Sequence, residues 1–181
     1  MNAFYERIDK VAHKLLEQSQ ALALPVNLEV VADFLGLAVL TRPLEEEYSG
    51  FLAVPEKTIV VNSRHALVRR RFTAAHEIGH YKLHRKKKPN LPAFIDRAVY
   101  FRRASGDDGN EVDRHMEMQA NAFAAGLLMP EYLLDEYLDK HPDVDIGQTA
   151  GIKQMADEFD VSRPAMEYRL RNLGFLLPTS F

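Results

Sequence analysis

Residues 69–84 read RRRFTAAHEIGHYKLH and contain the pattern His-Glu-x-x-His at positions 76–80. Side chains four residues apart share one face of an α-helix, so His76 and His80 can direct their imidazoles at one metal ion. Glu77 then lies beside that ion, where it can take a proton from a bound water. The pattern therefore predicts a helix that carries a metal site. The rest of the chain would supply a third ligand, the walls of the site and the contacts to a substrate.

The residues around this pattern favour a buried helix over a solvated one. A histidine pair at this spacing can also lie on an exposed face, which is the alternative. Burying two imidazoles and a carboxylate without partners would be costly, so a partly buried face favours the metal site. Glycine costs a helix interior ~1 kcal/mol, so Gly79 indicates a close approach by another element. The apolar or small stripe at helical spacing consists of Phe72, Ala75, Gly79 and Leu83.

Length and composition limit the class of protein. The 181 residues suffice for one compact domain, or for one domain with a small appendage. There are no cysteines, which excludes disulfides and thiolate ligands, so a metal must be held by His, Asp or Glu. No apolar run reaches the ~18 residues of a spanning helix, and the charged N-terminal residues lack the apolar core of a secretion signal. We expect a cytoplasmic protein without membrane contact, and the sequence leaves its oligomeric state open.

The net charge of −3 hides a strong asymmetry along the chain. Residues 64–103 hold 12 Lys or Arg against two acids, Glu77 and Asp96, whereas the remainder of the chain is acidic. Such a basic segment can attract an acidic partner or nucleic acid. For the run Arg85-Lys86-Lys87-Lys88 alone, an ordinary solvated surface is the better interpretation.

Hydrophobic periodicity predicts the other elements. Two apolar, β-prone runs at 50–54 and 58–61 form a hairpin. Asn62 and Ser63 break its second strand, and either can cap the helix that follows at 65–84. The last two helices resemble a helix-turn-helix. The remaining predicted elements are helices at 3–20, 30–35, 111–128, 131–138, 152–159 and 165–173, and strands at 37–40 and 98–102.

A catalytic site of this kind needs a third protein ligand. The metzincin continuation is absent, because Leu83 and Lys86 stand where its glycine and histidine would fall. Helix 111–128 offers four candidates, of which only Glu117 borders both the apolar stripe and the small residues of that helix. The alternative is an alanine-rich core helix that carries the Glu117 carboxylate at its solvent-exposed edge. The candidates are Glu111, Asp113, His115 and Glu117.

Several of these segments together resemble the ImmA/IrrE family of metallopeptidases. The resemblance covers about residues 28–130, and the C-terminal tail shows a weaker similarity. The usual family pattern has two acids before the Ala-Asn pair, and here the second is Gln119, which leaves Glu117 as ligand. The segments that carry the resemblance are Gly50-Phe51, Val61-Asn62-Ser63, RRRFTAAHEIGHYKLH, AVYFRRAS and EMQANAFAAGLLMP.

The resemblance implies a zincin-like α+β fold, with a small three- or four-stranded sheet beside a motif helix and a second, ligand-bearing helix. We expect a metallopeptidase domain over residues 1–142 and a C-terminal helical appendage over 143–181 that packs on it. His76, His80 and Glu117 would hold one divalent ion per chain. Zinc suits these ligands best, with Mn²⁺ or Fe²⁺ as alternatives.

Peptide-bond hydrolysis with Glu77 as the catalytic base is the chemistry this site implies. Family members act on helix-turn-helix repressors, and some are paired with antitoxins, so a protein of that kind is the expected substrate. The substrate is expected to pair as an extended peptide with a sheet edge at 50–61 or 98–102. The oxyanion-stabilising or supporting residue stays open among Tyr81, His84, Tyr100, His115 and Asn121.

Two other functions remain as alternatives. The first is a DNA-binding regulator that uses Arg163, Arg169 and Arg171 of the tail. Residues 152–172 carry as many acids as bases, which is poor for gripping phosphates, so nucleic acid is an unlikely direct ligand. The second is a module that sequesters a repressor without cutting it. We expect residues 147–181, which are apolar at both ends, to pack against the core and to help hold a regulator.

Overall fold

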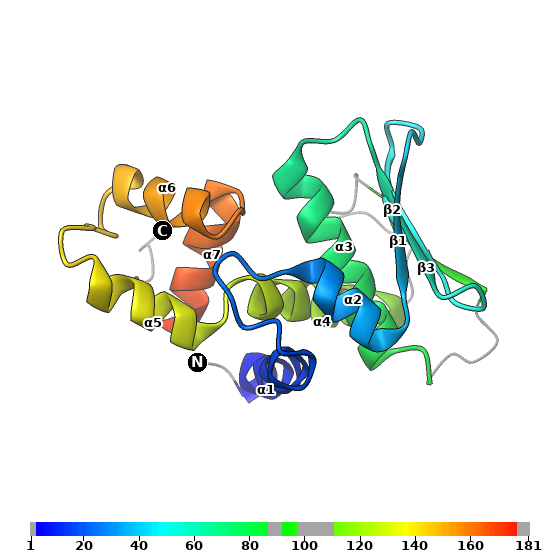
Figure 1. The fold of residues 1–181 in the computed structure, drawn as a ribbon, viewed down its shortest axis with the longest axis horizontal. Helices are drawn as coiled ribbons and strands as arrows, with labels where there is room; N and C mark the ends of the chain where they lie inside the picture. Colours follow the sequence, from blue (N-terminus) through cyan, green and yellow to red (C-terminus); the bar gives the residue numbers. More distant parts are fainter. Residues whose placement is uncertain (1–2, 87–91, 98–110, 177–181) are drawn as a thin grey trace.

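The computed structural model describes residues 3–86, 92–97 and 111–176, and it shows a mixed α+β fold, as predicted. The sheet packs along one side of α3, whereas α6 and α7 lie at the opposite end of the molecule (Figure 1). The elements in chain order are α1 (Ala3–Ser19), α2 (Leu28–Leu35), β1 (Ala38–Arg42), β2 (Tyr48–Ala53), β3 (Thr58–Asn62), α3 (Leu67–Leu83), β4 (Ala93–Arg97), α4 (Glu111–Leu128), α5 (Glu131–Lys140), α6 (Thr149–Glu158) and α7 (Arg163–Leu173).

The four described strands form one sheet in the order β1-β3-β2-β4. The predicted hairpin is confirmed, because β2 and β3 pair antiparallel with Leu52 opposite Ile59. β1 runs parallel to β3, and β4 runs antiparallel to β2. Both hairpin strands are therefore interior, so the expectation of a free edge along residues 50–61 is wrong. In the described sheet the outer strands are β1 and β4.

Asn62 closes the loop before β2 and does not cap the motif helix. Its buried side chain accepts hydrogen bonds from the amides of Leu44 and Arg64, both at 3.1 Å, and donates to the carbonyl of Tyr48 at 2.8 Å. The N-cap of α3 is Ala66, so the prediction that Asn62 or Ser63 caps this helix is wrong. The amide instead satisfies backbone groups where β3 ends, which sets the entry of the chain into α3.

The motif helix α3 is the central element of the fold. Its residues from Thr73 to Tyr81 are buried, including both histidines and Glu77. The sheet contacts it closely at Gly50, where an added Cβ would lie 2.7 Å from Cγ2 of Thr73. Helix α4 contacts it along its length, and the buried stripe of α4 matches the one predicted from sequence, namely Met116, Ala120, Phe123 and Leu127.

The C-terminal helices α6 and α7 contribute side chains to the hydrophobic core of the molecule. Met155, Phe159 and Leu170 are fully buried and belong to the same hydrophobic cluster as α1 and α4. Arg169 is buried as well, and it donates hydrogen bonds to Asp9 of α1 at 2.9 Å and to the carbonyl of Met129 at 3.0 Å. Packing and a buried ion pair therefore join α7 to the helical core.

One strand was missed by the sequence analysis. This strand is β4, Ala93–Arg97, which is absent from the elements predicted above. Its register, with Phe94 opposite Leu52, makes it the fourth strand of the sheet that packs along α3. The strand predicted at 98–102 lies outside the described residues, as does Phe181 of the tail.

Candidate metal centre

Three side chains from α3 and α4 converge on one point. His76 and His80 lie one turn apart on α3, and their Nε2 atoms are 2.9 Å from each other. The two carboxylate oxygens of Glu117, on α4, lie 3.3 Å from Nε2 of His76 and 3.2 Å from Nε2 of His80. Among the described residues, these three side chains form the one group of ligand atoms spaced for an ion, all within 4.8 Å of one another.

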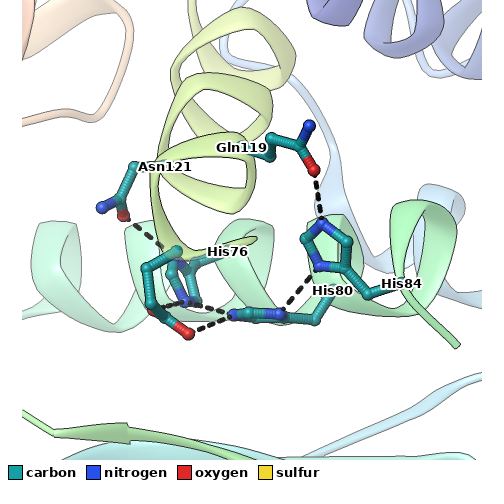
Figure 2. Close-up of polar contacts among 6 residues, drawn as sticks. His76, His80, His84, Gln119 and Asn121 are labelled. Atoms are coloured by element: carbon teal, nitrogen blue, oxygen red, sulfur yellow. Dashed lines mark hydrogen bonds and ion pairs between the residues drawn. The ribbon is translucent and has the colours of Figure 1, made fainter. Parts of the chain in front are cut away.

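The outer nitrogens of both imidazoles have partners that decide where their protons lie. Nδ1 of His76 is 2.9 Å from Oδ1 of Asn121, an oxygen that can only accept, so this Nδ1 carries the proton. Nε2 of His84 donates to Oε1 of Gln119 at 2.9 Å, which leaves Nδ1 of His84 to accept from Nδ1 of His80 at 3.1 Å. Figure 2 shows both sets of contacts. In the neutral state, both Nε2 atoms therefore carry lone pairs.

This arrangement fits a divalent metal ion. Two buried imidazole lone pairs face a carboxylate whose side chain is 33% exposed, and a cation between them would relieve their repulsion. Tetrahedral zinc with bonds of about 2.0–2.1 Å places its ligand atoms about 3.3 Å apart, which is close to the distances found here. The donor set of two nitrogens and one carboxylate also leaves a coordination position for water or substrate.

The pKa of the Glu117 carboxyl reflects the same surroundings. Burial by itself would raise this pKa, but hydrogen bonds and charge interactions with His76 and His80 in their protonated form outweigh burial. The net effect holds the pKa well below its ordinary value, so the group is a carboxylate, the form that binds metals.

A chain of side chains runs from His80 to the surface of α4. Beyond His84 and Gln119, Nε2 of Gln119 donates to Nε2 of His115 at 3.0 Å. His115 is exposed and stands edge-on to Phe4 of α1, with ring centroids 5.6 Å apart. His115 thus belongs to the surroundings of the site, although it does not reach the three ligand atoms. Gln119 was noted in the sequence as a departure from a family pattern, and its role in orienting His84 was missed.

Phe94 of β4 supports the second histidine from the sheet side. Its ring stacks on that of His80 with centroids 4.6 Å apart and planes 22° from parallel. The sequence analysis missed this residue, for which the apolar run Ala93-Phe94-Ile95 was the available signal. Phe94 and His84 therefore hold the imidazole of His80 from two sides.

The other predicted residues lie in different places. Glu77 is fully buried on α3, next to His76. Tyr81 is buried in the hydrophobic core, and the guanidinium of Arg85 lies 4.1 Å from its ring centroid. Tyr100 lies outside the described residues. Glu111 begins α4 and Asp113 lies in its first turn, and the group of three ligand atoms does not include Asp113.

Comparisons with known proteins identify the family of this chain and two similar proteins. The model of the Peptidase M78 family, described as the IrrE N-terminal-like domain, matches residues 32–171. The chain is 30% identical over 109 residues to "Uncharacterized immunity region protein 2" of Bacillus phage phi105, covering 59% of this chain and 61% of that one. The chain thus spans less than two thirds of the length of this relative.

A solved structure shares the fold. A "Mycobacterium tuberculosis transcriptional regulator" superposes with a TM-score of 0.60 at 17% sequence identity, over 92% of this chain and 48% of that chain. At this identity the likeness concerns the fold alone. Within the described residues, no helix is both long enough and apolar enough to cross a membrane.

Proposed function

Because the chain belongs to the Peptidase M78 family with its IrrE N-terminal-like domain, we propose that it is a zinc-dependent endopeptidase that cleaves a regulatory protein. The observation that carries this proposal is the convergence of two buried imidazole lone pairs and the half-buried Glu117 carboxylate on one point. His76, His80 and Glu117 are the proposed ligands of one ion. Zinc is the favoured metal, and Mn²⁺ or Fe²⁺ would accept the same donors.

Glu77 is the proposed catalytic base and acid. A divalent ion, when bound, supplies Lewis acidity toward water and the substrate carbonyl. Glu77 follows His76 directly on α3, and it would accept the proton of the attacking water and deliver it to the leaving amine. Asn121 and His84 would hold the imidazoles in the tautomer that binds the metal, which makes them positioning residues.

The proposed substrate is a helix-turn-helix repressor or an antitoxin. The name of the phage relative places that protein in an immunity region, which supports a substrate from such a regulatory circuit. We further propose that residues 1–142 form the peptidase unit and that 143–181 are an appendage packed on it. The alternative, a module that holds a repressor without cutting it, uses the same fold.

DNA binding by the tail is less well supported. Arg169 is buried and paired with Asp9, while Arg163 and Arg171 both pair with Glu167, at 3.0 Å and 2.9 Å. All three arginines proposed for phosphate contact thus already have acidic partners. A gel shift at ~50 mM salt, where phosphate contacts are strongest, tests this alternative, and a retarded band would favour it.

Co-expression with the product of the adjacent gene, followed by intact mass measurement, tests the proposed function. Cleavage at one site in the wild type and none in Glu77→Gln, with equal metal content, is the expected result. Glu158→Gln removes an exposed carboxylate of α6 and serves as the matched control, which should cut like the wild type. A stable uncut complex with the wild type and with Glu77→Gln would select the binding module instead.

A further inference from the structure

A cavity of about 590 Å³ lies between the metal-binding helices and the C-terminal helix pair. Its walls come from α3, α4, α7 and the turn before α7, and they are mostly apolar, including Phe72, Met118, Ala122, Ala125 and Ala165. Ligand cavities typically enclose about 300–1,000 Å³, so this one accommodates several side chains of a bound peptide. The three metal ligands do not themselves line this cavity, which adjoins the metal centre at Asn121.

The cavity continues directly from the metal centre along the same helix faces. On α3, Arg69 and Thr73 line it, and Thr73 lies about one turn before His76. On α4, Asn121 lines it one turn after Glu117. Asn121 therefore contacts both the metal centre and the cavity, because its side chain accepts the hydrogen bond from His76 and also forms part of the cavity wall. A substrate peptide bound across the metal centre would therefore place the residues beside its cleavage site in this cavity.

The charges of the lining select the occupant. Among the residues that the structure describes, no Asp or Glu lines the cavity, whereas two arginines do. Arg169 is offset by its ion pair with Asp9. Arg69 donates from Nη2 to the hydroxyl of Ser49 at 2.9 Å, and no carboxylate of the described residues pairs with its guanidinium. A partly buried guanidinium without a carboxylate partner favours an occupant that brings one to Arg69.

We propose that this cavity is the substrate-selecting pocket of the peptidase, and that it takes a segment with bulky apolar side chains next to an acidic residue. The inference rests on the proposed function, because it assigns the occupant to the protein that is cut. Apolar side chains would fill the space between α4 and α7, and the acidic side chain would pair with Arg69. The C-terminal helix pair then selects substrate by forming the far wall of the pocket, and DNA is not its ligand.

Peptide binding tests the proposal without cleavage. The chain has no tryptophan, so the fluorescence of a tryptophan-bearing peptide reports its own surroundings. The probes are acetyl-Gly-Glu-Trp-Leu-Gly-amide and the same peptide with Lys in place of Glu, titrated with full-length, zinc-loaded Glu77→Gln. We expect a blue shift on binding of the acidic peptide and at least about fivefold weaker binding of the lysine peptide, as befits one charge-assisted contact.

Two kinds of variant, each made in the Glu77→Gln protein, show where the peptide binds. Arg69→Gln should remove the preference for the acidic peptide, whereas Lys153→Gln, which removes an equal charge from the exposed side of α6, should keep it. Ala165→Phe and Ala125→Leu fill the cavity from α7 and from α4, and each should abolish the blue shift. Thermal melting identifies variants that fold, and two filling variants guard against the failure of one.

Four outcomes would overturn the proposal. They are absence of binding, unchanged binding by both folded filling variants, a preference for the acidic peptide that survives Arg69→Gln, and equally tight binding of free N-acetyltryptophan, which would indicate a small-molecule site. Failure of the proposed function is distinguishable, because it would show as an uncut partner in the mass measurement while the peptide result stands by itself.

Discussion

Gly79 of α3 packs directly against the backbone of Ala120 of α4. A Cβ built on Gly79 would lie 3.3 Å from both Cα and O of Ala120, and 3.1 Å from the ring of Phe123. Gly79 immediately precedes His80, and Ala120 follows Glu117 by three residues. The close contact of the two helices at this level therefore lets a carboxylate on α4 reach both imidazoles on α3.

Gly79→Ala should lower the stability of the protein despite the better helix propensity of alanine. The gain in propensity is ~1 kcal/mol, whereas an extra methyl in a tight contact costs about 1–3 kcal/mol. We also expect weaker metal binding, since α4 must move away from α3. Thermal melting with and without EDTA measures the first effect and a zinc titration measures the second. A rise in the melting temperature would contradict this account of the helix contact.

Removal of one ligand should abolish stoichiometric metal binding. We expect about one zinc per wild-type chain and a small fraction of that in His80→Ala and Glu117→Gln, because a catalytic site needs three protein ligands. His13→Ala is the control, since His13 is an exposed histidine that pairs with Glu17 on α1. Elemental analysis of the purified proteins gives the result, and equal metal in His80→Ala and wild type would refute the proposed ligand set.

Asn121→Ala should weaken metal binding without removing a ligand. The side chain holds the proton on Nδ1 of His76, and loss of such a partner typically costs 10–100-fold in metal affinity, so an effect of about that size is expected here. Competition with a chelator of known affinity measures the change, with the exposed Gln18→Ala of α1 as control. Wild-type affinity in Asn121→Ala would show that the contact does not orient the imidazole.

Alkaline pH should destabilise the contact between α1 and α7. Burial, followed by the hydrogen bond between the hydroxyls of Tyr5 and Tyr168 at 3.2 Å, raises the pKa of Tyr5 from 10.0 to about 12. The folded state thus keeps a proton that the unfolded state loses, so this contribution is complete below pH 10 and disappears as pH rises through about 12. Urea unfolding at pH 9 and 11 should show a larger loss for wild type than for Tyr5→Phe. Equal losses would contradict the raised pKa.

Truncation after Pro142 should unfold the protein. The deletion removes Met155, Phe159 and Leu170 from the common hydrophobic cluster and leaves Asp9 without Arg169. The single substitution Phe159→Ala is the milder test, with an expected loss of about 3–5 kcal/mol. Circular dichroism and urea unfolding measure both. A cooperative transition in the truncated chain would instead show that residues 1–142 fold independently. If that folded, truncated protein no longer cut the substrate, recognition would lie in the tail.

The sequence by itself determined the elements whose signals are local. The four-residue spacing of His76 and His80 places both on one helix face, and the hairpin at 48–62 follows from two short apolar runs around Pro55. Glu117 could be chosen among four candidates because its position relative to the buried stripe of its own helix is a property of that helix alone.

Only the tertiary structure decided which distant residues surround these side chains. Phe94 stacks on His80 because β4 joins the sheet beside β2, and Gln119 orients His84 because α3 and α4 pack in one register. Likewise, Arg169 pairs with Asp9 and not with an external phosphate because α7 docks on α1. Each contact joins residues far apart in the chain, and its formation depends on how whole helices and strands pack, which spacing within one element does not encode.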